Sequence, residues 1–273
     1  MITGQIKGNY VIINNIPAAV SEFTIDTSAD IYYEVVRIID GRFLFLSDHL
    51  SRLKHSTAHS ALTYPGDEQI RASLRSLLSV SHEKTGNIKI LLFSGSKNET
   101  HIVSHFVTHF YPAPEMYREG VSLRTFRHTR PQPGVKKWDA DFRARVNMFI
   151  DREQIYEALL LNEKDEITEG SRSNIFFIDG AGCILTPPTQ SVLPGITRKY
   201  VIQIITSLPI DFRESHVHVE ALDSLAACFL TGTSPMVLPV KRVDQSLYRP
   251  DHPVLLKIME SFGRIAADHM EEL

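Results

Sequence analysis

The chain has 273 residues, 43% of them hydrophobic and 22% charged, so it is long enough to bury a sizeable core and to form two modest domains. Its 29 Lys and Arg residues are outnumbered by 32 Asp and Glu residues, and the net charge of -3 argues against the basic field that nucleic-acid binding usually requires. No apolar segment approaches the length of a membrane span, which excludes an integral helical membrane protein.

Cysteine content and the first residues predict a cytoplasmic protein. Cys183 and Cys228 are the two cysteines, and their wide separation argues against both a disulfide framework and a structural zinc site. The segment 1–7 lacks the apolar run of a signal peptide. The 12 histidines are scattered without a recognisable metal spacing, so we expect no metal site.

A hairpin followed by a helix is predicted near the start of the chain. The ranges 31–39 and 42–46 have the composition of strands, and they flank Asp40-Gly41, a strong two-residue hairpin signal. Ser47-Asp48 then offers an N-cap for a helix. This helix would carry His49, Arg52 and Leu53.

The next elements complete an α+β unit. Helical spacing over 67–78 follows Pro65-Gly66, and 88–93 has the residues of a buried strand whose partner is 101–110. The partner strand begins with a histidine, His101.

The domain boundary is predicted at a proline-rich segment. Two prolines in Tyr111-Pro112-Ala113-Pro114 stop both helix and strand pairing and stiffen the connection. We therefore place an N-terminal domain at 1–112, a linker at 113–120 and a C-terminal domain at 121–273.

The second half repeats the mixture of strands and helices. Strands are expected at 121–126, 157–161, 175–178, 183–185 and 227–230, and helices at 142–154, 196–205 and 253–270. The glycine-containing segment 179–182 joins two of these strands as a hairpin, and the small residues 231–234 are expected to form a turn. The last helix is expected to lie on the surface.

Two segments carry most of the chemical information. Thr168 to Phe176 places a lone carboxylate, Glu169, on a turn ahead of an apolar strand. The range 193–198 reads Leu-Pro-Gly-Ile-Thr-Arg and lays a Gly-Ile-Thr turn onto the start of a helix, where free backbone N–H groups can hold a phosphate. A carboxylate and a phosphate cradle together indicate a phosphorylated cofactor.

These residues resemble the class IV aminotransferases, the pyridoxal-phosphate enzymes of fold type IV. The family includes branched-chain aminotransferases, D-amino-acid aminotransferases and aminodeoxychorismate lyases. The resemblance runs from about Tyr32 to about Val240, and its most specific parts are Thr-Glu-Gly-x-x-x-Asn at 168–174 and the motif at 193–198. Weaker matches are Tyr33-Glu34-Val35-Val36, which is similar to the D-amino-acid enzymes, His49-x-x-Arg52-Leu53, and Gly232-Thr233 before Pro239-Val240.

The resemblance implies a two-domain α/β (α+β) enzyme, similar to D-amino-acid aminotransferase, whose C-terminal domain carries most contacts to pyridoxal 5'-phosphate. A lysine would form an internal aldimine with the cofactor and then move a proton, which requires it to lose its own proton near neutral pH. We assign this role to Lys136, with Lys137 as its rival. The family's Asn three positions after the lysine is Asp139 here, and two solvated loop lysines are the alternative interpretation.

The resemblance also implies the cofactor contacts. Glu169 would keep the pyridine nitrogen protonated, so that the ring can accept electrons. The phosphate would rest on the N–H groups of Ile196 and Thr197, with the hydroxyls of Thr197 and Thr233 and the guanidinium of Arg52 around it. The full set is Arg52, Lys136, Glu169, Gly195, Ile196, Thr197 and Thr233. The structural alternatives are a turn glutamate, an ordinary helix entry and an exposed helix arginine.

Substrate recognition is predicted less completely. D-amino-acid aminotransferases of the family hold the substrate carboxylate with an Arg-x-His pair from the partner subunit's loop and with a tyrosine. Tyr33 and His101 match this pattern, whereas Glu99 stands at the arginine position and would repel a carboxylate. Lys97 and Arg124 are candidate replacements. Our hypothesis from this loop is a donor with a positively charged or neutral group facing it.

The expected function is transamination between a small amino acid or amine and a 2-oxo acid, in a homodimer because family sites take a loop from the second subunit. An aminodeoxychorismate lyase-like elimination of pyruvate, driven by the same lysine, remains the alternative within the fold. A non-catalytic descendant that keeps the fold and binds the cofactor is a further alternative, motivated by Glu99 and Asp139.

Overall fold

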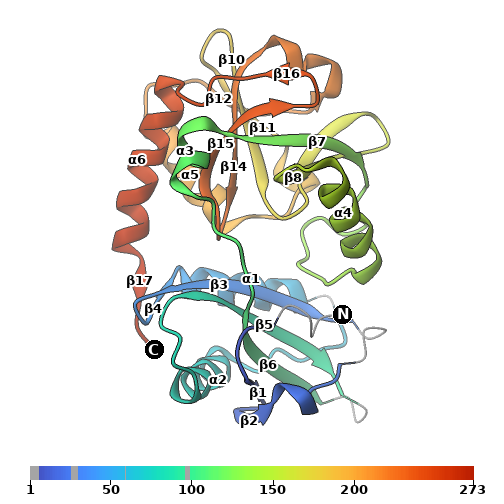
Figure 1. The fold of residues 1–273 in the computed structure, drawn as a ribbon, viewed down its shortest axis with the longest axis vertical. Coiled ribbons are helices and arrows are strands. Elements are labelled where there is room, and N and C mark those ends of the chain that lie inside the picture. Colours follow the sequence, from blue (N-terminus) through green and yellow to red (C-terminus); the bar gives the residue numbers. More distant parts are fainter. Residues whose placement is uncertain (1–5, 26–29, 59, 96–98) are drawn as a thin grey trace. The chain divides into compact units, whose positions relative to one another are not determined.

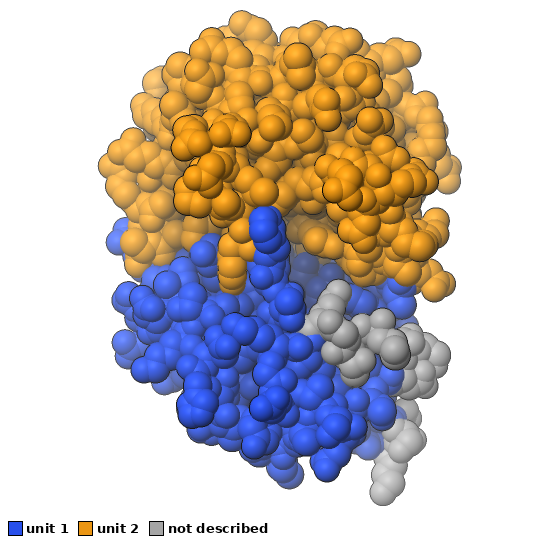
Figure 2. All heavy atoms as spheres, viewed as in Figure 1, with its two compact units in different colours: residues 1–110, 135–140, 268–273 blue, residues 111–134, 141–267 orange. Residues whose placement is uncertain are grey.

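The computed structural model describes residues 6–25, 30–58, 60–95 and 99–273 (Figure 1). It contains two compact units, coloured separately in Figure 2. Unit 1 comprises residues 1–110, 135–140 and 268–273, and unit 2 comprises residues 111–134 and 141–267. In the part of the chain that the structure describes, no helix combines the length and the hydropathy of a membrane span.

The division differs from the predicted boundaries in two places. The first passage between the units coincides with the proline-rich segment, but residues 135–140 and 268–273 return to unit 1. Residues 135–140 and 268–273 belong to unit 1 because they pair with strands that are distant from them in sequence. A proline-rich segment does not predict such pairing. Most of the predicted linker 113–120 forms a short helix, α3 (Pro114–Glu119), with Pro in its first turn. Proline is tolerated there because the N–H groups of the first turn make no hydrogen bond within the helix.

Unit 1 is built from one sheet and two helices. The strands are β1 (Tyr10–Ile13), β2 (Ile16–Ala19), β3 (Tyr32–Ile39), β4 (Arg42–Leu44), β5 (Gly86–Ser94), β6 (Thr100–Val107) and β17 (Met270–Glu271). The helices are α1 (Leu46–Thr57) and α2 (Asp67–Val80), with the short 3-10 helix η2 (Val20–Glu22). The seven strands pair antiparallel throughout in the order β17-β4-β3-β5-β6-β1-β2.

The predicted hairpin is confirmed. Ile39 pairs with Arg42, and the two residues between them, Asp40 and Gly41, have φ values of 49° and 81°. Positive φ at both central positions is the geometry whose twist matches that of the flanking strands.

The predicted N-cap of α1 is wrong. The helix begins at Leu46 after Phe45, which adopts a left-handed conformation and makes no side-chain cap. Ser47 instead lies inside the helix, where its N–H and hydroxyl donate to the Glu271 carboxylate at 2.9 and 2.5 Å. A carboxylate from the other end of the chain is a strong acceptor, and it takes both donors of the residue expected to cap the helix.

The two faces of β3 have different surroundings. Its burial alternates strictly along the strand, so that Tyr32, Glu34, Val36 and Ile38 are buried on one face. The apolar residues among them pack in one core with residues of α1 and α2. Tyr33 lies on the other face, beside a smaller cluster that includes Leu91 and Val103.

Unit 2 is built from a ten-stranded sheet. The strands are β7 (Val121–Arg127), β8 (Glu157–Leu161), β9 (Glu166–Gly170), β10 (Asn174–Asp179), β11 (Ile184–Thr186), β12 (Phe212–Glu214), β13 (Val217–His218), β14 (Leu225–Gly232), β15 (Met236–Val243) and β16 (Ser246–Leu247). The helices are α4 (Ala140–Glu153), α5 (Ile196–Thr206) and α6 (Pro253–Asp268), besides α3 and the 3-10 helices η3 (Thr189–Ser191) and η4 (Val219–Ser224).

The sheet of unit 2 is mixed. Its strands follow the order β12-β11-β10-β14-β15-β7-β8-β9-β13, with β16 paired to β15. β7 runs parallel to both β8 and β15, whereas β10 pairs antiparallel with β14. Fully buried Phe176 and Phe229 stack on these last two strands with ring centroids 5.1 Å apart.

Most predicted strands and helices are confirmed, with differences at their ends. The strand predicted at 101–110 ends at Val107. Thr231 and Gly232, predicted to form a turn, lie in β14, because they pair with Val237 and Met236 of β15. Small residues can extend a strand when the neighbouring strand provides their hydrogen-bonding partners. Local composition does not predict where such partners lie.

Gly120, between α3 and β7, should not tolerate a side chain. Its φ is +74°, and a Cβ there would lie 2.8 Å from the backbone nitrogen of Lys241. We expect Gly120→Ala to lower the free energy of unfolding by about 1–3 kcal/mol, measured by urea denaturation. The matched control is Gly180→Ala, since a Cβ at Gly180 meets nothing within 4 Å. Equal stabilities of the two variants would contradict the prediction.

Candidate active site

The predicted site residues divide into two groups, one in each unit. Unit 1 holds Tyr33, Arg52, His101, Lys136 and Lys137, and unit 2 holds Glu169, Gly195, Ile196, Thr197 and Thr233.

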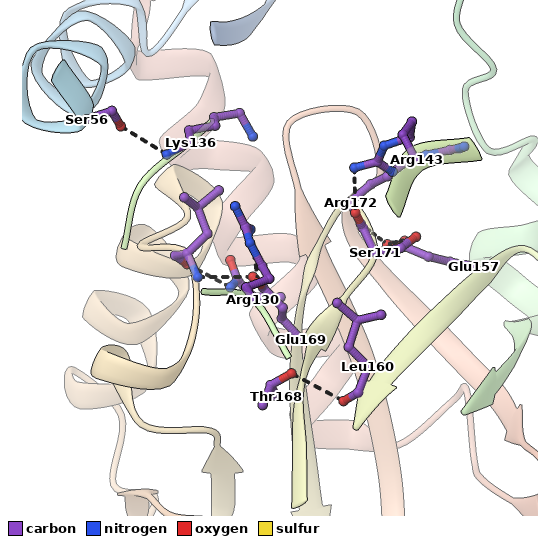
Figure 3. A network of polar contacts seen from close by, with 12 residues as sticks. Ser56, Arg130, Lys136, Arg143, Glu157, Leu160, Thr168, Glu169, Ser171 and Arg172 are labelled. Atoms are coloured by element: carbon purple, nitrogen blue, oxygen red, sulfur yellow. Dashed lines mark hydrogen bonds and ion pairs between the residues drawn. The ribbon is translucent and has the colours of Figure 1, made fainter. Parts of the chain in front are cut away.

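Lys136 lies on a short extended segment beside the start of β3. The N–H of Tyr33 donates to the Lys136 carbonyl at 3.1 Å, and the N–H of Trp138 donates to the Ile31 carbonyl at 2.8 Å. The Lys136 N–H donates to Ser56 Oγ of α1 at 3.2 Å (Figure 3). The backbone of Lys136 is therefore anchored on both its N–H and its carbonyl.

The two rival lysines have different surroundings. Lys136 Nζ lies 4.8 Å from the centroid of the Tyr33 ring. Lys137 Nζ pairs with the Asp30 carboxylate at 2.5 Å, and both side chains of this pair are exposed to solvent. Successive side chains of an extended segment point to opposite faces, which explains the separation. Lys136 is the lysine that lies against an aromatic side chain of the predicted site.

Arg52 is held by a buried carboxylate from β3. Its Nε and Nη2 atoms donate to the two oxygens of Glu34, both at 2.7 Å. His49, one helical turn before Arg52, contacts Glu34 Oε2 through Nδ1 at 2.8 Å. All three side chains are at most 8% exposed. The paired geometry fixes the plane of the guanidinium.

The charges of this trio balance. Burial would raise the pKa of the Glu34 carboxyl, but the charge of Arg52 and the hydrogen bonds from Arg52 and His49 outweigh it and hold the pKa well below its usual value. Burial lowers the pKa of His49 against the opposing attraction of Glu34. At neutral pH Glu34 is therefore a carboxylate, His49 is uncharged, and the His49 Nδ1–H donates to Glu34.

His101 is already engaged on both ring nitrogens. Asn14 Nδ2 donates to His101 Nδ1 at 3.0 Å, and Glu99 Oε1 lies 3.2 Å from Nε2. The ring stacks on Phe93 with centroids 5.4 Å apart. Glu99 is thus the hydrogen-bond partner of the histidine that the family pattern assigns to the substrate.

The structure does not support either Lys97 or Arg124 as the replacement for the family's carboxylate-binding arginine. Lys97 lies outside the described residues, and Arg124 of unit 2 pairs with Glu153 at 3.3 Å.

Glu169 lies in a strand, which corrects its predicted position on a turn. It is the fourth residue of β9 and is 3% exposed. Its Oε1 accepts from Arg130 Nη1 and its Oε2 accepts from the Leu193 N–H, both at 3.0 Å (Figure 3). Its carboxylate therefore joins β9 to the segment that leads into α5.

The entry to α5 has little room beside Gly195. Gly195 is the N-cap and supplies no side-chain cap to the first turn. Asn174 Nδ2 donates to the Leu193 carbonyl at 2.9 Å, and a Cβ on Gly195 would collide with the oxygen of the same Asn174 side chain. A side chain at this position therefore requires Asn174 or the backbone beside it to move.

Hydroxyl groups are present on the same unit. Thr197, in the first turn of α5, is buried, and Thr233, after β14, is half-buried. Thr231 lies directly opposite Asn174 in the pairing of β14 with β10. Its hydroxyl is buried and has no hydrogen-bond partner among the described residues. Residues directly opposite in an antiparallel pair share a face, so this hydroxyl lies beside the side chain that borders Gly195.

A second buried carboxylate, Glu157 of β8, was not predicted as a site residue. It accepts from the backbone N–H of Arg172, from Ser173 Oγ at 3.0 Å and from Ser171 Oγ at 3.3 Å. Burial raises the pKa of Glu157. The Arg143 guanidinium adds a bond to the Ser171 carbonyl at 3.0 Å (Figure 3). This network holds the turn between Glu169 and Asn174. The feature of the sequence that could have predicted it is a single glutamate, Glu157, at the start of an apolar strand.

The chain is similar to known proteins along most of its length. Residues 32–243 match the family model described as amino-transferase class IV. A Rickettsia conorii protein described as "probable branched-chain-amino-acid aminotransferase" is 25% identical over 252 residues, covering 86% of each chain. The D-alanine aminotransferase of Bacillus licheniformis is 24% identical over 222 residues, covering 78% of each.

Solved structures of branched-chain amino acid aminotransferases have a similar fold. For the Escherichia coli enzyme the TM-score is 0.82 at 21% identity, covering 97% of each chain. For another such enzyme, solved with pyridoxamine 5'-phosphate, the TM-score is 0.83 at 22% identity, covering 97% of this chain and 96% of that chain. This likeness confirms the predicted mixed α/β fold of type IV.

The Glu34–Arg52 pair should dominate the acid sensitivity of unit 1. We expect Glu34→Gln to lower the free energy of unfolding at pH 7 by about 3–5 kcal/mol, because it leaves the buried Arg52 charge uncompensated. The folded pKa of Glu34 lies below the unfolded value of 4.5, so its contribution is complete above that value and is lost as the pH falls below it. Denaturant unfolding at several pH values measures both effects.

The control is Glu68→Gln, which removes the exposed partner of Arg75. Such a surface pair contributes about 0–1 kcal/mol. A Glu34→Gln variant that unfolds like this control, or whose deficit persists unchanged down to pH 3, would refute the assignment.

Proposed function

The chain belongs to the class IV aminotransferase family, and we propose that it is a pyridoxal 5'-phosphate-dependent aminotransferase in which Lys136 is the central residue. The amino group would move between a small amino acid or amine and a 2-oxo acid. The observation that carries this proposal is the position of Lys136, anchored along β3 with its Nζ against the Tyr33 ring, while Lys137 pairs with Asp30.

When bound, pyridoxal phosphate supplies an aldehyde that reacts with amines and a ring that takes up electrons. Lys136 holds the proton that must move during transfer, at Nζ. Its backbone bonds to Tyr33 and Ser56 leave the side chain as the part that moves. Proton transfer by a positioned side chain depends first on such geometry.

The residues of unit 2 fit the cofactor in two respects. Glu169 is a buried carboxylate oriented by the Leu193 N–H and Arg130, which suits it to hold a proton on the pyridine nitrogen. The start of α5 suits the phosphate, since Gly195 leaves the first-turn N–H groups without a side-chain cap.

Hydroxyl groups complete the proposed phosphate site. The buried Thr231 hydroxyl, which has no partner in the described chain, and the Thr197 and Thr233 side chains are donors of the kind a phosphate accepts. Ile196 contributes its backbone N–H. For Arg52, whose guanidinium is oriented by Glu34 within unit 1, the role of phosphate ligand is carried by the family resemblance.

The substrates proposed here are amino acids and 2-oxo acids. The similar proteins are named for branched-chain amino acids and for D-alanine, which share a carboxylate next to the amino carbon. A homodimer and a cytoplasmic location stay predictions, carried by the family resemblance and by the two distant cysteines.

Covalent labelling tests the central residue. We expect borohydride to fix pyridoxal phosphate to the purified protein at Lys136, as mapped by peptide mass spectrometry. Lys136→Ala should abolish the label, and the matched variant Lys137→Ala should retain it, because Lys137 lies on the opposite face. A label at Lys137, or none in the wild-type protein, would contradict the proposal.

Product analysis separates the alternatives. Transfer yields a 2-oxo product together with the aminated cofactor. Release of pyruvate without any 2-oxo acid acceptor would instead identify a lyase. A cofactor spectrum unchanged by every amino donor would identify a non-catalytic descendant.

Gly195→Ala tests the phosphate site. The added methyl group collides with Asn174, so either the entry to α5 or the Asn174 side chain that binds the Leu193 carbonyl must shift. We expect the affinity for pyridoxal phosphate to fall at least about tenfold, or roughly 1.4 kcal/mol. Absorbance titration measures this. Gly180→Ala, with an open position, should bind as the wild type does. Tight cofactor binding by Gly195→Ala would move the phosphate elsewhere.

A further inference from the structure

A buried lysine on β5 lies close to Lys136. Lys89 occupies the middle of β5 and is 2% exposed. Lysines are almost never fully buried without a specific arrangement around them, so the surroundings of Lys89 carry information.

Two aromatic rings surround the Lys89 ammonium. Its Nζ lies 3.8 Å from the centroid of the Trp138 ring and 5.0 Å from that of Tyr33. Lys136 Nζ lies 4.8 Å from the same Tyr33 centroid. The two ammonium groups are therefore no further apart than the sum of their distances to one ring. Lys89 and Lys136 therefore both lie against the Tyr33 ring, which makes Lys89 a neighbour of the residue on which the proposed reaction depends.

Trp138 adds a second donor. Its indole Nε1–H is buried and has no hydrogen-bond partner within the described residues. The Lys89 ammonium lies over the ring, and the N–H projects from the edge of that ring. A buried donor without an acceptor is unfavourable by about 1–3 kcal/mol, and a carboxylate offers two acceptor oxygens.

The histidine facing Lys89 brings no charge at neutral pH. His105 lies directly opposite Lys89 in the β5–β6 pairing and is fully buried. Burial, aided by the Lys89 charge and opposed by a hydrogen bond to the Phe106 carbonyl, lowers the pKa of His105 to about 4. The positive charge between these two strands therefore belongs to Lys89.

This cluster is separate from the Arg52 trio. Tyr33 and Glu34 are successive residues of β3 and point to opposite faces of the sheet. Lys89 lies against Tyr33, whereas Arg52 is bound to Glu34. Lys89 and Arg52 are thus cationic groups in different places of unit 1, and Arg52 is the one proposed for the cofactor phosphate.

We propose that Lys89 and the Trp138 indole N–H form the subsite that binds the carboxylate of the amino donor and of the 2-oxo acid. This inference rests on the proposed function, because it takes Lys136 as the reacting residue. It gives the carboxylate a cation on β5, whereas the position that holds an arginine in the D-amino-acid enzymes is Glu99 here. It also replaces the expectation of a positively charged or neutral donor by one of an anionic donor.

Trp138 is the only tryptophan of the chain, so intrinsic fluorescence reports on this subsite directly. The cofactor-loaded protein is titrated with pyruvate and, separately, with hydroxyacetone, a neutral ketone of similar size. We expect a saturable fluorescence change with pyruvate, and at least about tenfold weaker binding of hydroxyacetone. Equal responses to both probes would overturn the proposal, and this comparison needs no variant.

Variants test the charge itself. Lys89→Met, which keeps an unbranched side chain and removes the charge, should weaken the pyruvate response at least about tenfold and raise the KM for pyruvate similarly with little change in kcat. Lys84→Met is the matched control, since Lys84 is exposed just before the same strand. Wild-type pyruvate binding by folded Lys89→Met would refute the role of Lys89.

A separate measurement distinguishes failure of the proposed aminotransferase function from failure of the carboxylate subsite. Borohydride labelling at Lys136 is measured on the same preparations. A pyruvate response that depends on Lys89 without any label at Lys136 supports the subsite and refutes the aminotransferase. A label at Lys136 with no dependence of pyruvate binding on Lys89 refutes the subsite and retains the enzyme.

Discussion

The two-residue period of β3 is the constraint on which the arrangement of unit 1 depends. Because successive side chains leave opposite faces, Glu34 is directed into the helical side and Tyr33 to the other. Glu34 then orients Arg52, and Tyr33 contacts two lysines. The segment around Lys136 pairs alongside this strand and follows the same alternation. One strand thereby separates the buried Glu34–Arg52 ion network from the lysines that contact Tyr33 by the thickness of a sheet.

Compensation of buried charge explains why these groups occur in clusters. An ion removed from water loses several kcal/mol, so a buried charged side chain persists where partners or rings surround it. Glu34 and Arg52 neutralise each other while His49 stays uncharged. Lys89 lies on two aromatic rings, contacts that contribute about 0.5–2 kcal/mol each. Stiff surroundings of this kind also fix the orientation of the charged groups, so a ligand that binds them would require little reorganisation.

Unit 2 contributes preorganisation of a different kind, through backbone groups. Glu169 binds the N–H of Leu193, and Asn174 binds the carbonyl of the same residue, so both side chains hold the segment that leads into α5. Glu157 fixes the turn between them. The carboxylate and the helix start that a phosphorylated cofactor requires are thus tied into one hydrogen-bonded network, and a change at one position is transmitted to the other.

The sequence by itself determined the features encoded locally. These include the hairpin at Asp40-Gly41, most strands and helices, and the two motifs on which the family assignment rests, because turn chemistry and hydrophobic periodicity act over a few residues. Tertiary structure alone decided the start of α1, the strand position of Glu169 and the return of residues 135–140 to unit 1. It also gave Lys136 and Lys137 different surroundings and buried Lys89. Each of these depends on pairing between segments distant in sequence, and such pairing leaves no mark on the local pattern from which a single sequence is interpreted.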